Sequence, residues 1–329
     1  GVVEPRSRKE INRLLFFHHS IHQNSRWENE TLALENSIEL RDDFSLRGRC
    51  EMFRVNLDSM VAAHQLHQGS NLRGHLVWAR YQHFQRLLSI RNVPTEFEDE
   101  EILQFFRDTN DPDLYMERNA MSRSEFRKLV SPLVRSGHLI QDYRGGFRTV
   151  EPLRKVDLWE IKRNYLRKLV EDYPVITLKQ VERLAGASFA PEEISDVMHD
   201  FEDDGTLIKG FLVDDLQDIC WGRLDMLEGM GKISRTRDLV IPPSDPLIHY
   251  FGSLLRERFG FGSAYLVFHK EEPIAAFKAN TRNDKIELTD FVGDSELEKE
   301  AIRVMKEFAW EHDMPLSGKL FDRIRSRIV

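Results

Sequence analysis

The sequence predicts an α+β protein that is mostly helical and is divided into several modules. Two segments of similar length, 95–152 and 156–215, each combine helical periodicity with a short hairpin pattern. After Pro242-Pro243 the pattern changes to alternating runs separated by turn residues, which predicts a small module with an antiparallel sheet. At roughly 100–200 residues per domain, a chain of 329 residues is long enough for two or three packed units.

Residues 1–94 are predicted to form a helical N-terminal domain that ends at Pro94. Apolar residues at helical spacing predict four helices, at 9–21, 31–40, 54–68 and 76–90. The polar stretch 23–30 separates the first helix from the second.

Residues 95–155 are predicted to form three helices and a two-stranded ribbon, the first helix being 98–108. Ser122 and Glu125 form the pattern of a capping box, which begins a helix that Gly137 ends. The turn Arg144-Gly145-Gly146 then joins two short strands, 138–143 and 147–150. Helices followed directly by such a ribbon are typical of a winged helix, a variant of the helix-turn-helix.

The same order of elements recurs in residues 156–236, which predicts a second winged-helix unit with an exit helix. Its predicted helices are 158–172, 178–184, 191–204 and a last one within 216–236, with extended chain at 173–176 and 206–213.

Residues 237–329 are predicted to form the α+β module. Its predicted helices are 246–259, 295–311 with Ser295 and Glu298 as a capping box, and a basic one from 316 onward; its strands are 264–269, 274–279 and 285–291.

The composition limits the partners and the compartment. A formal net charge of −8 argues against a protein that coats nucleic acid non-specifically, although a local face can still be basic. Cys50 and Cys220 are the only cysteines and form neither a disulfide framework nor a zinc motif. No run reaches the roughly 18 apolar residues of a membrane span. We therefore expect a cytoplasmic or nucleoid-associated protein with no cofactor, no metal and no membrane partner.

Basic residues concentrate in the first winged-helix unit, on the helix and the turn that would meet nucleic acid. Seven basic residues oppose only Glu125 and Asp142 there, and the glycines of the turn allow close approach of the backbone to phosphate. The candidate DNA contacts are Arg118, Arg123, Arg127, Lys128, Arg135, Arg144, Gly145, Gly146 and Arg148. The expected partner is duplex or branched DNA; the alternative is ordinary solvated surface charge.

The corresponding helix of the second unit, 191–204, is acidic. Its seven carboxylates would repel phosphates: Glu192, Glu193, Asp196, Asp200, Glu202, Asp203 and Asp204. We expect this helix to pack, to bridge modules or to meet a basic surface of another protein chain.

Several segments together resemble the tandem winged-helix DNA glycosylases that act on bulky alkyl adducts and crosslinks. They are the opening run 13–19, the stretch 201–212 with Ile219-Cys220-Trp221, and 245–261 followed by the strand 273–278. The C-terminal region of the bacterial large helicase-related proteins has a similar architecture. The resemblance implies a DNA-binding protein, with repair of damaged bases as its activity.

Glycosylases of that family carry a Gln-apolar-Asp or Gln-apolar-Gln motif, and the nearest match here is Asn56-Leu57-Asp58, with Asn in place of Gln. The resemblance implies that Asp58 stabilises the cationic sugar and that Asn56 positions water, with His64 or His67 near the leaving base. The alternatives are an Asp58 that only decorates a surface helix, structural histidines, and a non-catalytic interaction or regulatory module. No P-loop, dinucleotide fingerprint or nucleophile elbow occurs.

Overall fold

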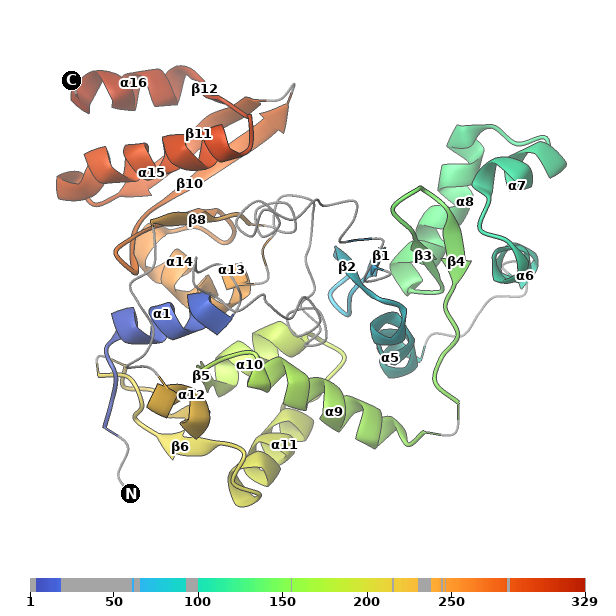
Figure 1. The fold of residues 1–329 in the computed structure, drawn as a ribbon, viewed down its shortest axis with the longest axis horizontal. Coiled ribbons are helices and arrows are strands. Elements are labelled where there is room, and N and C mark those ends of the chain that lie inside the picture. The colour runs from blue at the N-terminus through green and yellow to red at the C-terminus, as the bar shows by residue number, and fades with distance from the viewer. Residues whose placement is uncertain are drawn as a thin grey trace.

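The computed structural model describes residues 4–18, 61, 66–92, 100–154, 156–214, 216–229, 238–243, 245, 247–282 and 285–328. Over this part of the chain the fold is α+β and mostly helical, as predicted, with three separate sheets. Figure 1 shows α6–α8 with β3 and β4 at one end of the long axis, and β10, β11, α15 and α16 at the other. None of the helices in the described ranges is long and apolar enough to cross a membrane.

The order of elements predicted for 95–152 is confirmed. Three helices precede a hairpin: α6 Glu100–Asp108, α7 Pro112–Arg118, α8 Arg123–Ser136, β3 Leu139–Gln141 and β4 Phe147–Thr149. The capping box forms, because Glu125 N donates to Ser122 Oγ at 3.3 Å and Ser122 N donates to Glu125 Oε2 at 2.9 Å. Gly137, at a φ of 90°, ends α8 in the left-handed conformation.

The helices predicted at 54–68 and 76–90 are wrong where they overlap the strands β1 Leu66–Ser70 and β2 Leu76–Arg80; α5 begins only at Tyr81 and ends at Arg91. The two strands form an antiparallel hairpin with Leu66 opposite Arg80. Asn71 closes its turn, because its Oδ1 accepts from the N–H groups of Arg73 and His75. Pairing between strands outweighed the apolar periodicity, which cannot separate a short strand from a helix.

The first sheet joins this hairpin to β3 and β4, in the order β2-β1-β3-β4. Gln68 of β1 lies opposite Gln141 of β3, so strands from both sides of the predicted boundary at residue 94 share one sheet. Tyr81 Oη donates to the carbonyl of Thr149, which fastens α5 to β4. The turn that joins β3 to β4 is therefore held by residues 66–92.

The three helices predicted in 156–215 are confirmed, whereas the hairpin extends beyond that range. The elements are α9 Leu158–Glu171, β5 Val175–Thr177, α10 Leu178–Ala185, α11 Pro191–Asp203, β6 Ile208–Gly210, β7 Cys220–Gly222 and α12 Leu224–Gly229. Strand β7 lies between β5 and β6 and is antiparallel to both. A bridge from Arg6 to Val213 fixes the chain just before α1 Arg8–His18 beside this sheet.

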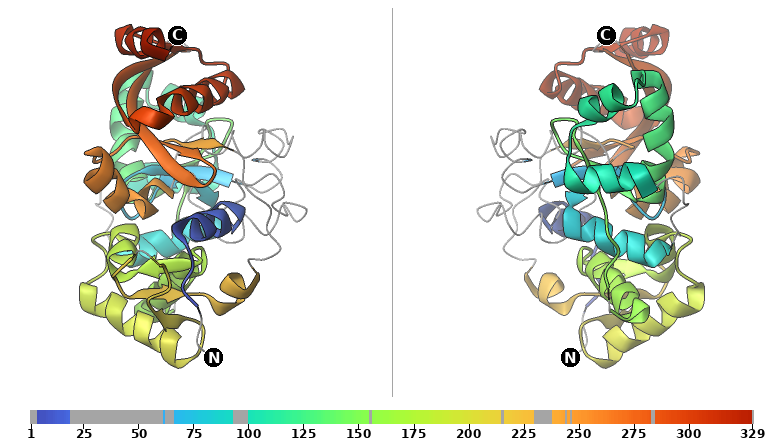
Figure 2. Two further views of the ribbon diagram at one scale, coloured as in Figure 1. Left: turned by 90° about the vertical axis from the view of Figure 1, so that its left-hand side faces the viewer. Right: turned by 90° about the vertical axis from the view of Figure 1, so that its right-hand side faces the viewer.

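The C-terminal module has the three predicted strands, as β9 Tyr265–His269, β10 Glu272–Arg282 and β11 Lys285–Gly293. They belong to a five-stranded sheet in the order β12-β11-β10-β9-β8, antiparallel except for the β11–β12 pair. The remaining elements are β8 Leu239–Ile241, α13 Leu247–Tyr250, α14 Gly252–Phe259, η3 Ser295–Leu297, α15 Glu298–Glu311, β12 Leu316–Ser317 and α16 Lys319–Ile328. Figure 2 shows α15 and α16 on the side opposite to α9 and α11.

Three details of this module correct the sequence prediction. The helix expected at 246–259 is divided into α13 and α14. The capping box of Ser295 and Glu298 does not form: Ser295 lies in the 3-10 turn, and Leu297 precedes α15 without a side-chain cap. The short strand β12 occupies 316–317, so the last helix begins at Lys319.

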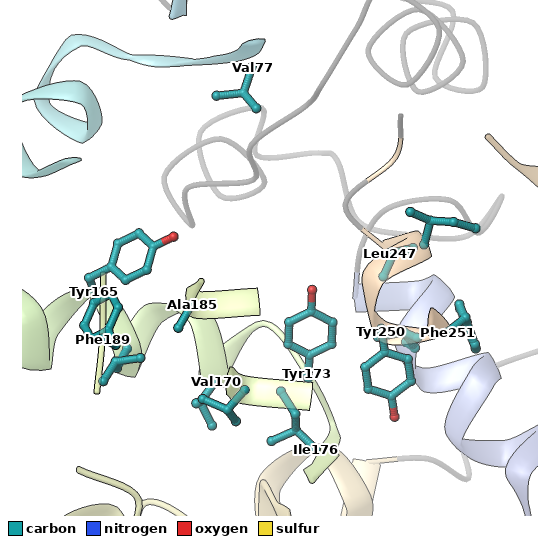
Figure 3. Close-up of a cluster of buried hydrophobic side chains, with 14 of the residues drawn as sticks. Val77, Tyr165, Val170, Tyr173, Ile176, Ala185, Phe189, Leu247, Tyr250 and Phe251 are labelled. Atoms are coloured by element: carbon teal, nitrogen blue, oxygen red, sulfur yellow. The ribbon is translucent and has the colours of Figure 1, made fainter. Parts of the chain in front are cut away.

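One continuous apolar core contacts nearly every module. It contains Phe16 of α1, Val77 of β2, Tyr165 of α9 and Phe251 before α14, all buried. Figure 3 shows part of this cluster, including Val170 and Ile176 beside a pair of tyrosine rings. Burial of apolar surface at roughly 25 cal/mol per Å² is the dominant stabilising contribution, so the modules stabilise one another.

A stacked pair of tyrosines occupies the middle of this core. The rings of Tyr173 and Tyr250 are parallel within 5°, with centroids 5.2 Å apart (Figure 3). Tyr250 Oη donates to the carbonyl of Val175 at 2.8 Å, so the buried strand β5 gains a partner for one backbone acceptor. Burial raises the pKa of Tyr250, which keeps this hydroxyl a neutral donor.

We expect Tyr250→Phe to lower the free energy of unfolding by about 1–3 kcal/mol, because the Val175 carbonyl then stays buried without its donor. Urea unfolding monitored by circular dichroism measures this loss. The half-exposed Tyr143 supplies the control, since Tyr143→Phe should change stability by less than about 0.5 kcal/mol. Equal stability of the parent and Tyr250→Phe would contradict the prediction.

Candidate nucleic-acid interface

Helix α8 separates apolar from basic residues on two sides. Phe126, Val130 and Leu133 are buried and pack against the aromatic residues of α6 and α7. The opposite side exposes four cations, which we call the α8 basic face: Arg123, Arg127, Lys128 and Arg135. Because the apolar side fixes the rotation of the helix, these cations all point to solvent.

The α8 basic face keeps most of its charge unneutralised. Among the described residues, no carboxylate lies within ion-pair distance of Arg127, Lys128 or Arg135, and the contact of Arg123 with Asp113 is long, at 3.9 Å. Glu125, the only acid on the helix, is engaged in the capping box, and its hydrogen bonds with Ser122 lower its pKa. An open depression on this face is lined by Arg123, Ser124, Arg127, Lys128 and Ser131. Unpaired cations beside hydroxyl groups are suited to phosphate.

The turn between β3 and β4, residues 142–146, is held by Asp142. Its Oδ1 accepts from the N–H groups of Arg144 and Gly146, both at 2.8 Å. Gly145 has a φ of +88°, which favours glycine at that position. The turn is therefore a defined structure that projects the side chain of Arg144 into solvent.

Three of the predicted arginines lie over aromatic rings. The guanidinium carbon of Arg148 is 4.0 Å from the centre of the Tyr81 ring, and that of Arg144 is 5.2 Å from the Tyr143 ring. Arg118 lies 5.4 Å from the ring centre of Phe105. Cation–π contacts orient the planar guanidinium groups, and Arg144 Nε also donates to Tyr143 Oη at 2.8 Å.

Neither tyrosine of these pairs was predicted from the sequence to belong to the interface. Tyr143 precedes Arg144 directly, so the adjacency of an aromatic and a basic residue at a turn was a usable signal. Tyr81 lies far from Arg148 in sequence and meets it only through the sheet β2-β1-β3-β4. No local pattern indicates that contact.

Gly146 occupies a different environment from the one expected of a phosphate contact. It is buried, and a Cβ atom there would lie 2.7 Å from the backbone oxygen of Asn110 and 2.7 Å from Asp142 Oδ2. Asn110 O accepts from Phe147 N at 3.0 Å, so the turn packs closely on the chain before α7. This packing accounts for the glycine without any ligand.

Of the four candidate catalytic residues, only His67 falls within the described part of the chain; Asn56, Asp58 and His64 lie outside it. His67 is on strand β1, not on the predicted helix, and its side chain is buried. Its ring centre is 6.4 Å from that of Tyr81. Tyr81 thus lies between His67 on one side and Arg148 of β4 on the other, which places His67 near the β3–β4 hairpin.

Basic residues of α9 pair with three of the seven carboxylates in 191–204. Lys162 pairs with Glu193 at 2.7 Å, Arg163 with Asp200 at 3.1 Å, and Arg167 with Asp204 at 3.1 Å. Burial acts to raise the pKa of Glu193, but hydrogen bonds from Lys162 and from Ala190 N lower it overall. The helix packs, as one of the stated alternatives expected, and its acidity by itself does not indicate a protein partner.

Within the described ranges, no group of three His, Cys, Asp or Glu side chains is arranged to hold a metal ion. The one described cysteine, Cys220, is buried, and burial raises its thiol pKa to about 11, which keeps it protonated.

Comparison with solved structures identifies a protein of the same architecture. The DNA glycosylase AlkZ of Streptomyces sahachiroi matches with a TM-score of 0.65, over 96% of this chain and 100% of that one. The chain shares the fold of this glycosylase. Only 11% of the aligned residues are identical, and no family model and no curated protein matches the sequence. The expected resemblance to a DNA glycosylase is thereby confirmed for the fold, and that to the large helicase-related proteins stays a prediction.

We expect Gly146→Ala to lower the free energy of unfolding by about 1–3 kcal/mol, because the new methyl group overlaps the Asn110 oxygen. Chemical denaturation measures the change. Gly262→Ala is the matched control: a Cβ atom meets nothing within 4 Å there, so stability should hold. If the two variants unfold alike, Gly146 is not required by packing.

Proposed function

We propose that the chain binds DNA through a winged-helix unit formed by 95–155, with α8 as the recognition helix and the β3–β4 turn as the wing. The α8 basic face and the arginines of the turn project from adjacent elements and remain exposed. In winged helices the helix enters a groove while the flanking ribbon meets the backbone. The partner is duplex or branched DNA, and residues 156–236 form a second unit of the same type whose acidic helix does not contact phosphate.

We further propose that the chain is a DNA-repair glycosylase that hydrolyses the N-glycosidic bond of damaged bases. The observation that carries this proposal is the likeness to AlkZ over 96% of the chain, since it includes every module and not the DNA-binding unit alone. The exposed cations of α8 supply the contact with DNA that such an enzyme needs. This role places the protein in the cytoplasm, associated with the nucleoid.

The proposed chemistry rests on Asp58. Departure of the base leaves positive charge on the sugar, and an ionised carboxylate shielded from water stabilises that charge. Asp58 is the only carboxylate between Glu51 and Glu96, which makes it the sole candidate in this stretch. Asn56 positions the attacking water through its amide. The side chain of His67 is buried in β1, which favours a structural role for it. His64 is therefore the better candidate for a group near the leaving base.

A second candidate function is favoured by one observation, the Asn at position 56 where the resembled glycosylases have Gln. A shorter amide would place water differently, and a protein that has lost catalysis would keep the DNA-binding surface. The chain would then be a non-catalytic interaction or regulatory module, associated with a helicase or with transcription.

Replacing Arg144 and Arg148 together by Ala should weaken binding to DNA about equally for all sequences. The plot of log K against log salt has a negative slope, and each lost phosphate contact should make that slope less steep by about 0.9. Fluorescence anisotropy with single-stranded, duplex and branched DNA across a salt series measures both quantities.

The control changes charge equally at the far end of the molecule. Arg323→Ala with Arg325→Ala removes two exposed arginines from α16, which lies away from α8 in Figure 1. Its salt slope should match that of the parent. An unchanged slope in the Arg144 and Arg148 double variant would remove the β3–β4 turn from the interface.

Asp58→Asn should reduce release of free base from alkylated or crosslinked duplex DNA by at least about 100-fold, as loss of a transition-state electrostatic contact does. Chromatographic detection of the released base measures this. DNA affinity should stay at the parental value, and Asp196→Asn, on the exposed side of α11, should retain full activity.

Two results would decide against catalysis at Asp58. Equal base release by the parent and by Asp58→Asn would assign the chemistry to another group. Absence of release by the parent across a panel of lesions, with DNA binding intact, would leave the chain as a binding module.

A further inference from the structure

A second cationic cluster lies away from α8, where three elements meet. Arg73 belongs to the turn between β1 and β2, Arg183 to α10 and Arg256 to α14. Arg256 is exposed and the other two are partly buried. The three residues lie far apart in the sequence and meet only through the β1–β2 hairpin, which the sequence did not predict.

Hydrogen bonds and close packing fix the position of Arg183. Its Nη2 donates to Ser253 Oγ at 3.1 Å, and its Nη1 lies 3.4 Å from the carbonyl of His249. A Cβ atom at position 252 would lie only 2.8 Å from that Nη1, so Gly252 makes room for the guanidinium group. The side chain is pre-oriented before any ligand arrives.

The β1–β2 turn is also packed against α10 and α13. The side chain of Arg73 packs against Gly186: a Cβ atom added at Gly186 would lie 3.1 Å from Arg73 Cγ. The imidazole of His75 stacks on that of His249, with centroids 6.2 Å apart and planes within 10°. The turn therefore brings its arginine to a defined place beside Arg183.

The charges of Arg73 and Arg256 act on Arg183. Burial lowers the pKa of Arg183, and the nearby charges of Arg256 and Arg73 lower it further, opposed only in part by Glu257. Like charges held close together repel one another, and an anion placed among them relieves the repulsion. Guanidinium groups match phosphate with paired hydrogen bonds.

We infer that Arg73, Arg183 and Arg256 form a second phosphate-binding site, which holds the nucleic-acid backbone at a distance from the α8 basic face. The inference rests on the proposed DNA binding and deepens it. It makes the interface bipartite, with one contact on each end of the sheet β2-β1-β3-β4.

The topology of that sheet supports a polymer as the ligand. Because β1 and β3 are antiparallel, the β1–β2 turn with Arg73 and the β3–β4 turn with Arg144 lie at opposite ends of the sheet. The five residues of β1 alone span roughly 17 Å. A duplex carries a charge every ~1.7 Å along its axis and can reach both ends at once, which a small phosphate cannot.

The test replaces the exposed member of the cluster, which should leave the fold intact. Arg256→Gln removes one charge there, and Arg258→Gln is the matched control on the same helix, because Arg258 is already paired with Asp294 at 2.8 Å. We expect Arg256→Gln to bind duplex DNA more weakly, with a salt slope about 0.9 smaller than that of the parent. The affinity ratio of parent to variant should then shrink about threefold between about 50 mM and 200 mM salt. Arg258→Gln should match the parent, and all three should melt at the same temperature.

The outcomes separate the two proposals. Parental affinity and slope in Arg256→Gln, with weakened binding in the Arg144 and Arg148 double variant, overturn the second site and leave the first interface standing. Failure of the parent to bind any DNA overturns both. A rise in melting temperature with inorganic phosphate that Arg256→Gln abolishes, without any change in DNA affinity, assigns the site to free phosphate and overturns its role in DNA binding.

Discussion

The core shared by β2, α9, α10 and the segment 247–259 determines where the surface charges lie. Val77 from the hairpin, Tyr165 from α9 and Phe251 before α14 belong to one buried cluster, so none of these segments can shift alone. The hairpin β1–β2 is thereby fixed, and through its pairing with β3 it fixes the β3–β4 turn. Interiors packed at crystal-like density transmit such constraints without slack. The positions of Arg73 and Arg144, at opposite ends of the sheet, therefore both depend on this shared apolar core.

The net charge of −8 conceals a separation of charges between the modules. Three of the seven carboxylates in 191–204 pair with basic residues of α9 within the chain. On α8, the described residues supply one such partner, Asp113, at 3.9 Å from Arg123. Exposed ion pairs contribute at most about 1 kcal/mol each to stability, so this difference matters little for folding. It matters for partners, because only unpaired cations release counterions when they meet phosphate.

The sequence predicted what depends on neighbouring residues and failed where distant ones compete. The capping box of Ser122 and the left-handed Gly137 were predictable because each acts within one turn of helix. The pattern at Ser295 has the same residue types, yet a 3-10 turn occupies the position and the box does not form. The apolar run from Leu76 continues into α5 with helical spacing, so only pairing with β1 reveals β2 as a strand. Exposure of the α8 cations followed from the same local periodicity, whereas the contact of Arg148 with Tyr81 required the sheet.

A glycine in a turn is weaker evidence for a phosphate-binding site than a group of exposed arginines. Gly145 and Gly146 suggested a backbone open to phosphate, but Gly146 is buried against Asn110 and the conformation of the turn accounts for both residues. A glycine required by packing would be present with or without DNA. Exposed arginines without ion pairs are different, since folding gains nothing from grouping them and their mutual repulsion opposes it. Arg148 is exposed and oriented by the ring of Tyr81, and Arg183 is partly buried and held by hydrogen bonds, so each keeps a positive charge in a fixed place where an external anion can meet it.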